Sequence, residues 1–127
     1  MNVDEKFKQL KVLASNYGYS FSYSSYHYYD KIKTGSAVDH GRKMIITMPK
    51  ITEREIIGVC HELGHIKDRL KTNKRRNRKN KYIRIYEEVL AWMYAIPYLI
   101  KFKTPFLLTV HSIYFSLLSY MKCRRRK

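Results

Sequence analysis

The chain has 127 residues, of which 45% are hydrophobic and 28% are charged. It is long enough for one domain with a substantial core, and it is too apolar to be an intrinsically disordered chain. Two cysteines are too few for a disulfide scaffold, and the charged start has no apolar secretion segment, so we expect a reducing, cytoplasmic setting.

The net charge of +16 is concentrated in two short segments. Residues 71–81 hold seven Lys or Arg and no acid, and residues 122–127 hold five, whereas the rest of the chain is nearly balanced. We expect a basic loop and a basic tail that contact nucleic acid or an acidic protein, although solvated charge without a partner explains each segment equally well. The residues proposed for such contacts are Lys74, Arg75, Arg76, Arg78, Lys79, Arg124, Arg125 and Arg126.

The first half of the chain predicts a helix followed by a small sheet. Apolar residues recur at helical spacing over residues 4–17, and Gly18 ends this pattern. Residues 19–24 alternate as a half-buried strand does, residues 33–36 and 39–41 have turn chemistry, and residues 42–48 form a second strand ended by Pro49. We expect a small antiparallel sheet or hairpin. Six tyrosines between positions 17 and 29 fit a strand face packed on a helix better than a platform for stacking bases.

The second half predicts three helices. Residues 52–55 read as a capping box that starts a helix running to about residue 70. Its core stripe has 3–4 spacing and contains Ile56, Val59, Leu63, Ile66 and Leu70. Another helix spans residues 82–100, where Pro97 is expected to kink it or end it early. A last helix covers residues 105–121.

A membrane role for the last helix must also be considered. Residues 104–121 carry no Asp, Glu, Lys or Arg, but Thr109, Ser112, Ser116 and Ser119 fall on one face. A buried amphipathic helix that closes the domain explains this pattern better than a membrane span or a helix on a membrane surface.

A metal-binding pattern lies within the helix that starts at residue 53. Residues 61–65 read HELGH, so two histidines stand four positions apart on one helix face and can meet a single metal ion. They lie nearly opposite the Leu63 stripe, so one face packs while the other is free for a ligand. A catalytic zinc also needs a third protein ligand and an open position. No histidine follows closely, but carboxylates do, at Glu87 and Glu88.

The two helices together resemble the ImmA/IrrE family of small zinc metallopeptidases. The resemblance is carried by HELGH and by Glu88-Val89-Leu90-Ala91-Trp92-Met93-Tyr94-Ala95, and it covers roughly residues 1–100. It implies an α+β, minimal zincin-like domain, here a single domain over residues 1–127. It also implies one Zn²⁺ per chain held by His61, His65 and Glu88, with Glu62 as general base.

The expected reaction is hydrolysis of a peptide bond by a water that zinc activates. Tyr86, Tyr94 and His111 are alternative donors to the oxyanion, and the sequence does not choose among them. Asp68 lies one turn past His65, where a carboxylate can orient an imidazole, but its position at the helix end favours an exposed carboxylate.

By resemblance, the substrate is a specific protein, such as a helix-turn-helix DNA-binding repressor of a phage or mobile element, in the cytoplasm of a bacterial cell or an infected host cell. The alternative is a basic module that binds nucleic acid or a host protein and has a structural or vestigial metal site.

Overall fold

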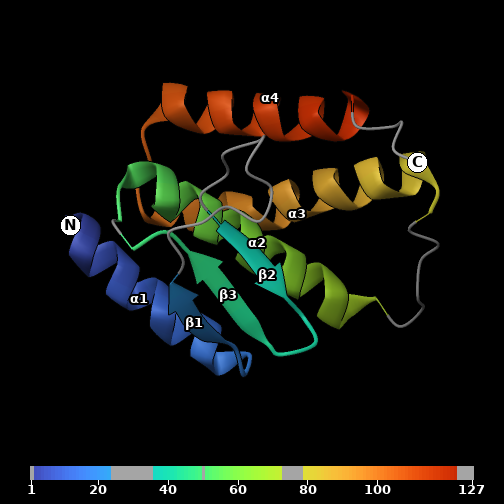
Figure 1. Cartoon of the computed structure of the whole chain (residues 1–127). Coiled ribbons are helices and arrows are strands. Elements are labelled where there is room, and N and C mark those ends of the chain that lie inside the picture. Colours follow the sequence, from blue (N-terminus) through green and yellow to red (C-terminus); the bar gives the residue numbers. More distant parts are fainter. Residues whose placement is uncertain (1, 24–35, 50, 73–78, 123–127) are drawn as a thin grey trace.

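The structure is a computed structural model that describes residues 2–23, 36–49, 51–72 and 79–122. In these residues it is an α+β fold of four helices and a three-stranded mixed sheet, in agreement with the predicted class (Figure 1). The predicted residues Lys74, Arg75, Arg76, Arg78, Arg124, Arg125 and Arg126 lie outside the described part.

Helix α1 (Val3–Asn16) leads into a sheet whose central strand comes last in the sequence. β1 (Ser20–Tyr23) and β2 (Ser36–Asp39) both pair with β3 (Met44–Thr47), and the order is β1-β3-β2. β1 runs parallel to β3, and β2 runs antiparallel to it. The prediction of an antiparallel pair from the first two strand patterns is therefore wrong, and residues 36 and 39, predicted as turns, are the ends of β2.

Helix α2 (Glu53–Lys71) is the centre of the fold and packs against α1, α3, α4, β2 and β3. Its predicted core stripe is buried at Ile56, Val59, Leu63 and Ile66, whereas Leu70 is 59% exposed because the helix extends beyond the core at its end. The capping-box prediction is wrong in detail. The helix starts where expected, but the Thr52 side chain makes no capping hydrogen bond.

Helices α3 (Lys81–Lys101) and α4 (Phe106–Lys122) complete the domain, with α4 on the outside (Figure 1). α3 does not end early at Pro97, which is exposed and lies inside the helix. The prediction that α4 is buried is wrong, because none of its described side chains is buried. Of its described apolar residues, Leu108, Ile113 and Leu117 pack partly buried against the core.

Candidate metal centre

Helix α2 presents the two histidines of HELGH side by side. His61 and His65 are one turn apart, and their rings lie 4.6 Å from centroid to centroid. Their side chains are 12% and 18% exposed, so both rings sit at the edge of the core within reach of solvent. The opposite face of the helix is the buried stripe that fixes its rotation. Packing on one side therefore determines where the imidazoles point.

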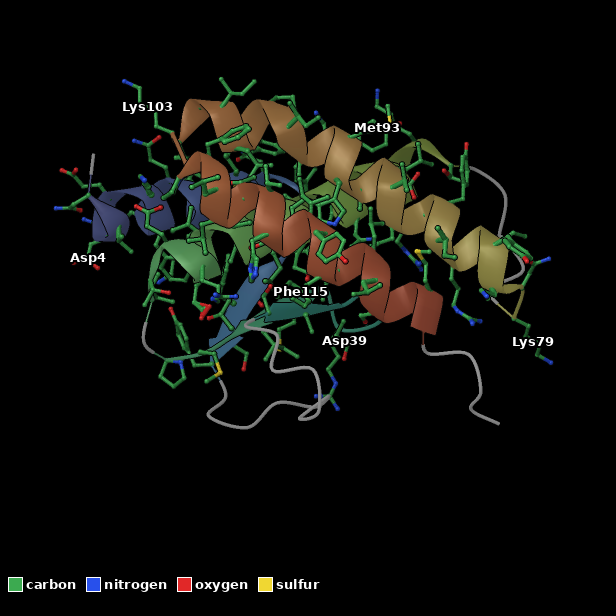
Figure 2. All side chains as sticks on the ribbon, turned by 90° about the horizontal axis from the view of Figure 1, so that it is seen from above. Asp4, Asp39, Lys79, Met93, Lys103 and Phe115 are labelled. Carbon is green, nitrogen blue, oxygen red and sulfur yellow. The ribbon has the colours of Figure 1, made fainter. Side chains whose placement is uncertain are left out.

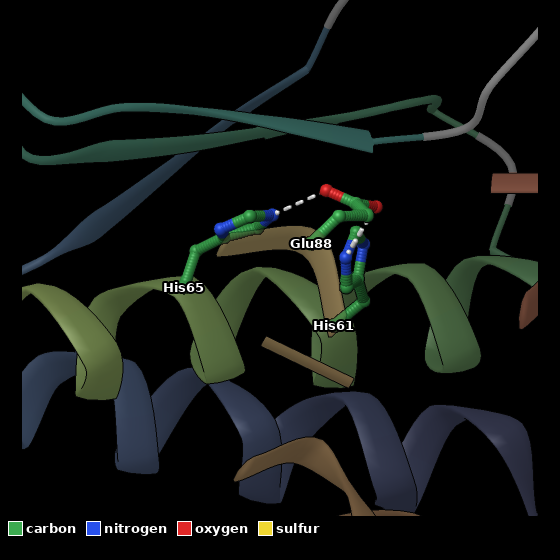
Figure 3. A group of neighbouring side chains, drawn as sticks. All are labelled: His61, His65 and Glu88. Atoms are coloured by element: carbon green, nitrogen blue, oxygen red, sulfur yellow. Dashed lines mark hydrogen bonds and ion pairs between the residues drawn. The ribbon is translucent and has the colours of Figure 1, made fainter. Parts of the chain in front are cut away.

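Helix α3 supplies the carboxylate. Glu88 Oε2 lies 2.8 Å from His61 Nε2, and Glu88 Oε1 lies 3.1 Å from His65 Nε2 (Figure 3). One ligand atom from each of the three residues falls within 4.8 Å of the others, so the predicted cluster is formed. Glu88 is 1% exposed, so the surrounding residues shield its carboxylate almost completely from solvent.

The close approach of α2 and α3 depends on Gly64. A Cβ atom added to Gly64 would lie 1.9 Å from the carbonyl oxygen of Ala91. Gly64 stands between the two histidines along α2, and Ala91 lies one turn after Glu88 on α3. Contact of the two backbones at this point sets the distance between imidazoles and carboxylate.

The electrostatics of the cluster favour a cation. Burial alone raises the pKa of Glu88, but the imidazoles of His61 and His65 lower it more, so its pKa lies well below its ordinary range. Within the described part of the chain, His61 Nε2 is a buried polar atom without a hydrogen-bond partner, since its approach to Glu88 lacks the geometry of a hydrogen bond. Two nitrogens and a carboxylate oxygen are common donors to divalent metals, zinc among them, so these residues are compatible with a metal ion.

Ser116 and Trp92 form a chain of hydrogen bonds that ends on Glu88. The Ser116 hydroxyl of α4 donates to Glu88 Oε2, and Trp92 Nε1 donates to Ser116 Oγ at 3.1 Å. The Trp92 ring also stacks on His61, with the centroids 4.1 Å apart and the planes 10° from parallel. The sequence showed Ser116 only as one member of a Ser/Thr row. Its contact with a residue 28 positions earlier depends on how α4 packs, which no local pattern reveals.

We expect Ser116→Ala to weaken zinc binding by about 10- to 100-fold, the usual effect of removing a hydrogen bond to a metal ligand. The variant loses the hydroxyl that orients Glu88 and leaves Trp92 Nε1 without this acceptor. Affinity is measured by competition with a chromogenic chelator. Ser112→Ala, one turn away on the same helix and also half-buried, is the matched control. Equal affinities of the two variants would contradict this role of Ser116.

Glu62 lies beside the cluster, on the side of strand β2. It is 7% exposed, its Oε2 accepts a hydrogen bond from Ser36 Oγ at 3.3 Å, and the same oxygen is 3.9 Å from His61 Nδ1. The Gly58 position allows this arrangement, because a Cβ there would lie 2.5 Å from Ser36 Oγ. Gly58 therefore serves the packing of β2 on α2. Ser36 is a positioning residue that the sequence did not reveal, since it was predicted to be part of a turn.

The other predicted site residues are not members of the cluster. Asp68 is not the exposed carboxylate that the sequence favoured, because it is 5% exposed and accepts a hydrogen bond from Thr72 Oγ1 at 3.3 Å.

The three residues predicted as oxyanion donors lie on α3 and α4. At about 100° per residue, Tyr86 and Tyr94 project from other sides of α3 than Glu88 does. Tyr94 lies under Lys71, with 5.9 Å from Nζ to the ring centroid. His111 is exposed on α4 and packs edge-on against Phe115. Lys79 is also exposed.

Comparison of the chain with models of known protein families, with curated proteins and with solved structures gave no match.

Proposed function

We propose that the protein is a zinc-dependent peptidase. The observation that carries this proposal is the convergence of His61, His65 and Glu88 from two helices, with Glu62 directly beside them in the sequence. Three protein ligands leave one position of a tetrahedral zinc open, which is the pattern of catalytic rather than structural zinc sites. The resemblance of HELGH and the Glu88 helix to the ImmA/IrrE family points to the same activity.

A zinc ion bound by these residues would lower the pKa of a coordinated water and polarise the scissile carbonyl. Glu62 takes a proton from the attacking water as the new carbon–oxygen bond forms, and it passes that proton to the leaving amine as the carbon–nitrogen bond breaks. Ser36 holds the Glu62 carboxylate, and Ser116 holds that of Glu88. Each reacting or ligating carboxylate thus has one hydroxyl that restricts its rotation.

The proposed substrate is a specific protein in the cytoplasm, in keeping with the ImmA/IrrE resemblance, and a helix-turn-helix repressor is the first to test. The basic segments would recruit either an acidic protein or a repressor already bound to DNA. The direct experiment mixes the zinc-loaded protein with the repressor encoded beside its gene, and follows cleavage by mass spectrometry. Cleavage at defined bonds that EDTA abolishes is the expected result.

We expect Glu88→Gln to lose more than about a hundredfold in zinc affinity, because an amide replaces a ligand and not only a supporting group. Glu87→Gln is the control, since the two carboxylates are adjacent and only Glu88 reaches the histidines. Elemental analysis and chelator competition measure both variants. If Glu87→Gln loses zinc and Glu88→Gln does not, the third ligand is Glu87 and this assignment of Glu88 is wrong.

The concentration of seven basic residues in residues 71–81 favours a second function, that of a module binding nucleic acid or a host protein around a structural metal. Binding of duplex DNA would weaken with salt, with a slope of about −0.9 per phosphate contact on logarithmic axes. Neutralising Arg75, Arg76, Arg78 and Lys79 should then reduce this slope by about 3–4. Undetectable binding of unrelated DNA at low salt would exclude nucleic acid as the partner.

A further inference from the structure

Helix α4 turns both polar and apolar residues inward. Ser116 contacts Glu88 and Trp92, and Leu108, Ile113 and Leu117 pack partly buried against the core. An amphipathic helix ordinarily turns its apolar side to the core. Here Ser116, which holds Glu88, takes up part of the inward side. Several other apolar residues of the helix are exposed.

One exposed side of α4 is apolar. At about 100° per residue, five exposed apolar side chains fall within an arc of about 100°, which begins about 80° from Ser116 and ends opposite it. They form what we call the α4 apolar face: Phe106, Leu107, Val110, Tyr114 and Met121. Their exposed fractions range from 47% for Val110 to 79% for Leu107. In the view from above, α4 lies at the front of the molecule with α3 beside it (Figure 2).

Helix α3 adds an apolar stripe next to this helix. Val89, Met93, Ile96 and Ile100 recur at spacings of four, three and four, so they lie in one line along α3. They are 38%, 58%, 47% and 71% exposed. Exposed apolar residues scattered singly need no explanation, but two neighbouring helices with aligned apolar residues indicate an interaction surface.

The charged residues that follow Glu88 in the sequence are all basic. After Glu88 the sequence has no Asp or Glu, and it has seven Lys or Arg. Lys101 and Lys103 precede α4 and are exposed. The basic residues 122–127 follow at its other end in the sequence. An apolar helix face with cations at both ends matches an anionic lipid surface, where each Lys or Arg near the headgroups adds to the attraction.

A second copy of the chain fits this surface less well. Each copy carries a net charge of +16, and pairing the α4 apolar faces would bring segments without acidic residues together. Such like-charged faces repel one another. The described residues contain no helix long and apolar enough to span a bilayer. We propose that the α4 apolar face binds an anionic membrane surface, with α4 lying in the plane of the headgroups.

The test is co-sedimentation with vesicles, using the full chain. We expect binding to vesicles of mixed phosphatidylcholine and phosphatidylglycerol, and none to pure phosphatidylcholine. The double variant Leu107→Ser/Tyr114→Ser should lose about tenfold or more in affinity for each residue, since each buries a large apolar group. Val12→Ser and Leu70→Ser are matched controls, because these residues are 61% and 59% exposed but lie on α1 and at the end of α2. Circular dichroism confirms that each variant is folded.

Two controls separate this proposal from others. Glu62→Gln should bind vesicles as the wild type does, so failure of the peptidase proposal would leave membrane binding intact. Sedimentation velocity without lipid tests for a second copy. A dimer that Leu107→Ser/Tyr114→Ser abolishes would overturn the proposal in favour of self-association. Absence of vesicle binding at low salt, or equal binding by wild type and the double variant, would also overturn it.

Discussion

Glu62→Gln should lower hydrolysis of the substrate by about 10²- to 10⁴-fold, the usual contribution of general acid–base catalysis. The amide cannot take a proton from water, yet it has the size of the carboxylate and its oxygen can still accept from Ser36 Oγ. Glu62 is not one of the three ligands, so the variant should bind zinc as the wild type does. Rates of substrate cleavage and elemental analysis on the same preparation measure both properties.

The matched control is Glu87→Gln, the same chemical change at a carboxylate outside the cluster, which should keep full activity. If Glu62→Gln retains the wild-type rate with zinc bound, general base catalysis by this residue is excluded. If the variant is also fully active in the cell that makes the protein, the binding-module function takes precedence over the peptidase.

Gly64→Ala should cost about 3 kcal/mol or more of folding free energy, or prevent folding altogether. The new methyl group would lie 1.9 Å from the Ala91 carbonyl oxygen, which belongs to the backbone, so α2 and α3 must separate. Overpacking in a core usually costs about 1–3 kcal/mol when side chains can move aside, and here none can. The free energy is measured by urea unfolding.

Gly41→Ala is the control for this prediction. Its added Cβ meets only Asp39 Oδ1, at 3.4 Å, and Gly41 does not require positive φ. This variant should unfold within about 0.5 kcal/mol of the wild type, as surface substitutions commonly do. An unfolding midpoint of Gly64→Ala equal to that of the wild type would show that the two helices do not approach as closely as the structure has them.

The helices were predictable from the sequence because their apolar periodicity is strong, and because Gly18 follows the first helix and Pro105 precedes the last. The stripe from Ile56 to Ile66 fixes both the existence of α2 and the direction of its histidines. Periodicity does not show where the core ends, which is why Leu70 was assigned to it. Asp68 was misjudged for the opposite reason, since its burial comes from tertiary packing near the helix end.

The sheet was less predictable. β2 is four residues long and has Ser36 and Asp39 at its ends, two residue types that favour turns over strands. It forms because β3 offers an edge for pairing, and this is a long-range cause. Strand direction is likewise set by the path of the connection, so the parallel pairing of β1 with β3 has no local signal.

The three candidate metal ligands were predictable, whereas the serines that hydrogen-bond to the carboxylates of the site were not. His61 and His65 share one helix, and the resemblance assigned Glu88, so three residues could be named before their distances were known. Ser36 and Ser116 reach the site from β2 and α4. Serine is common on exposed helix faces and in turns, so only the tertiary arrangement distinguishes these two from the others.

The strand order β1-β3-β2 has a consequence for folding during synthesis. Because the chain grows from its N-terminus at about 5–20 residues per second, β1 and β2 are made before β3, the strand with which both pair. Helix α2, with both histidines, follows β3 closely in the sequence, so the sheet and the helix that packs on it become available together. Glu88 and then Ser116 emerge later. Sheet pairing can therefore begin early, whereas assembly of the complete cluster of His61, His65 and Glu88 is a late event of biosynthesis.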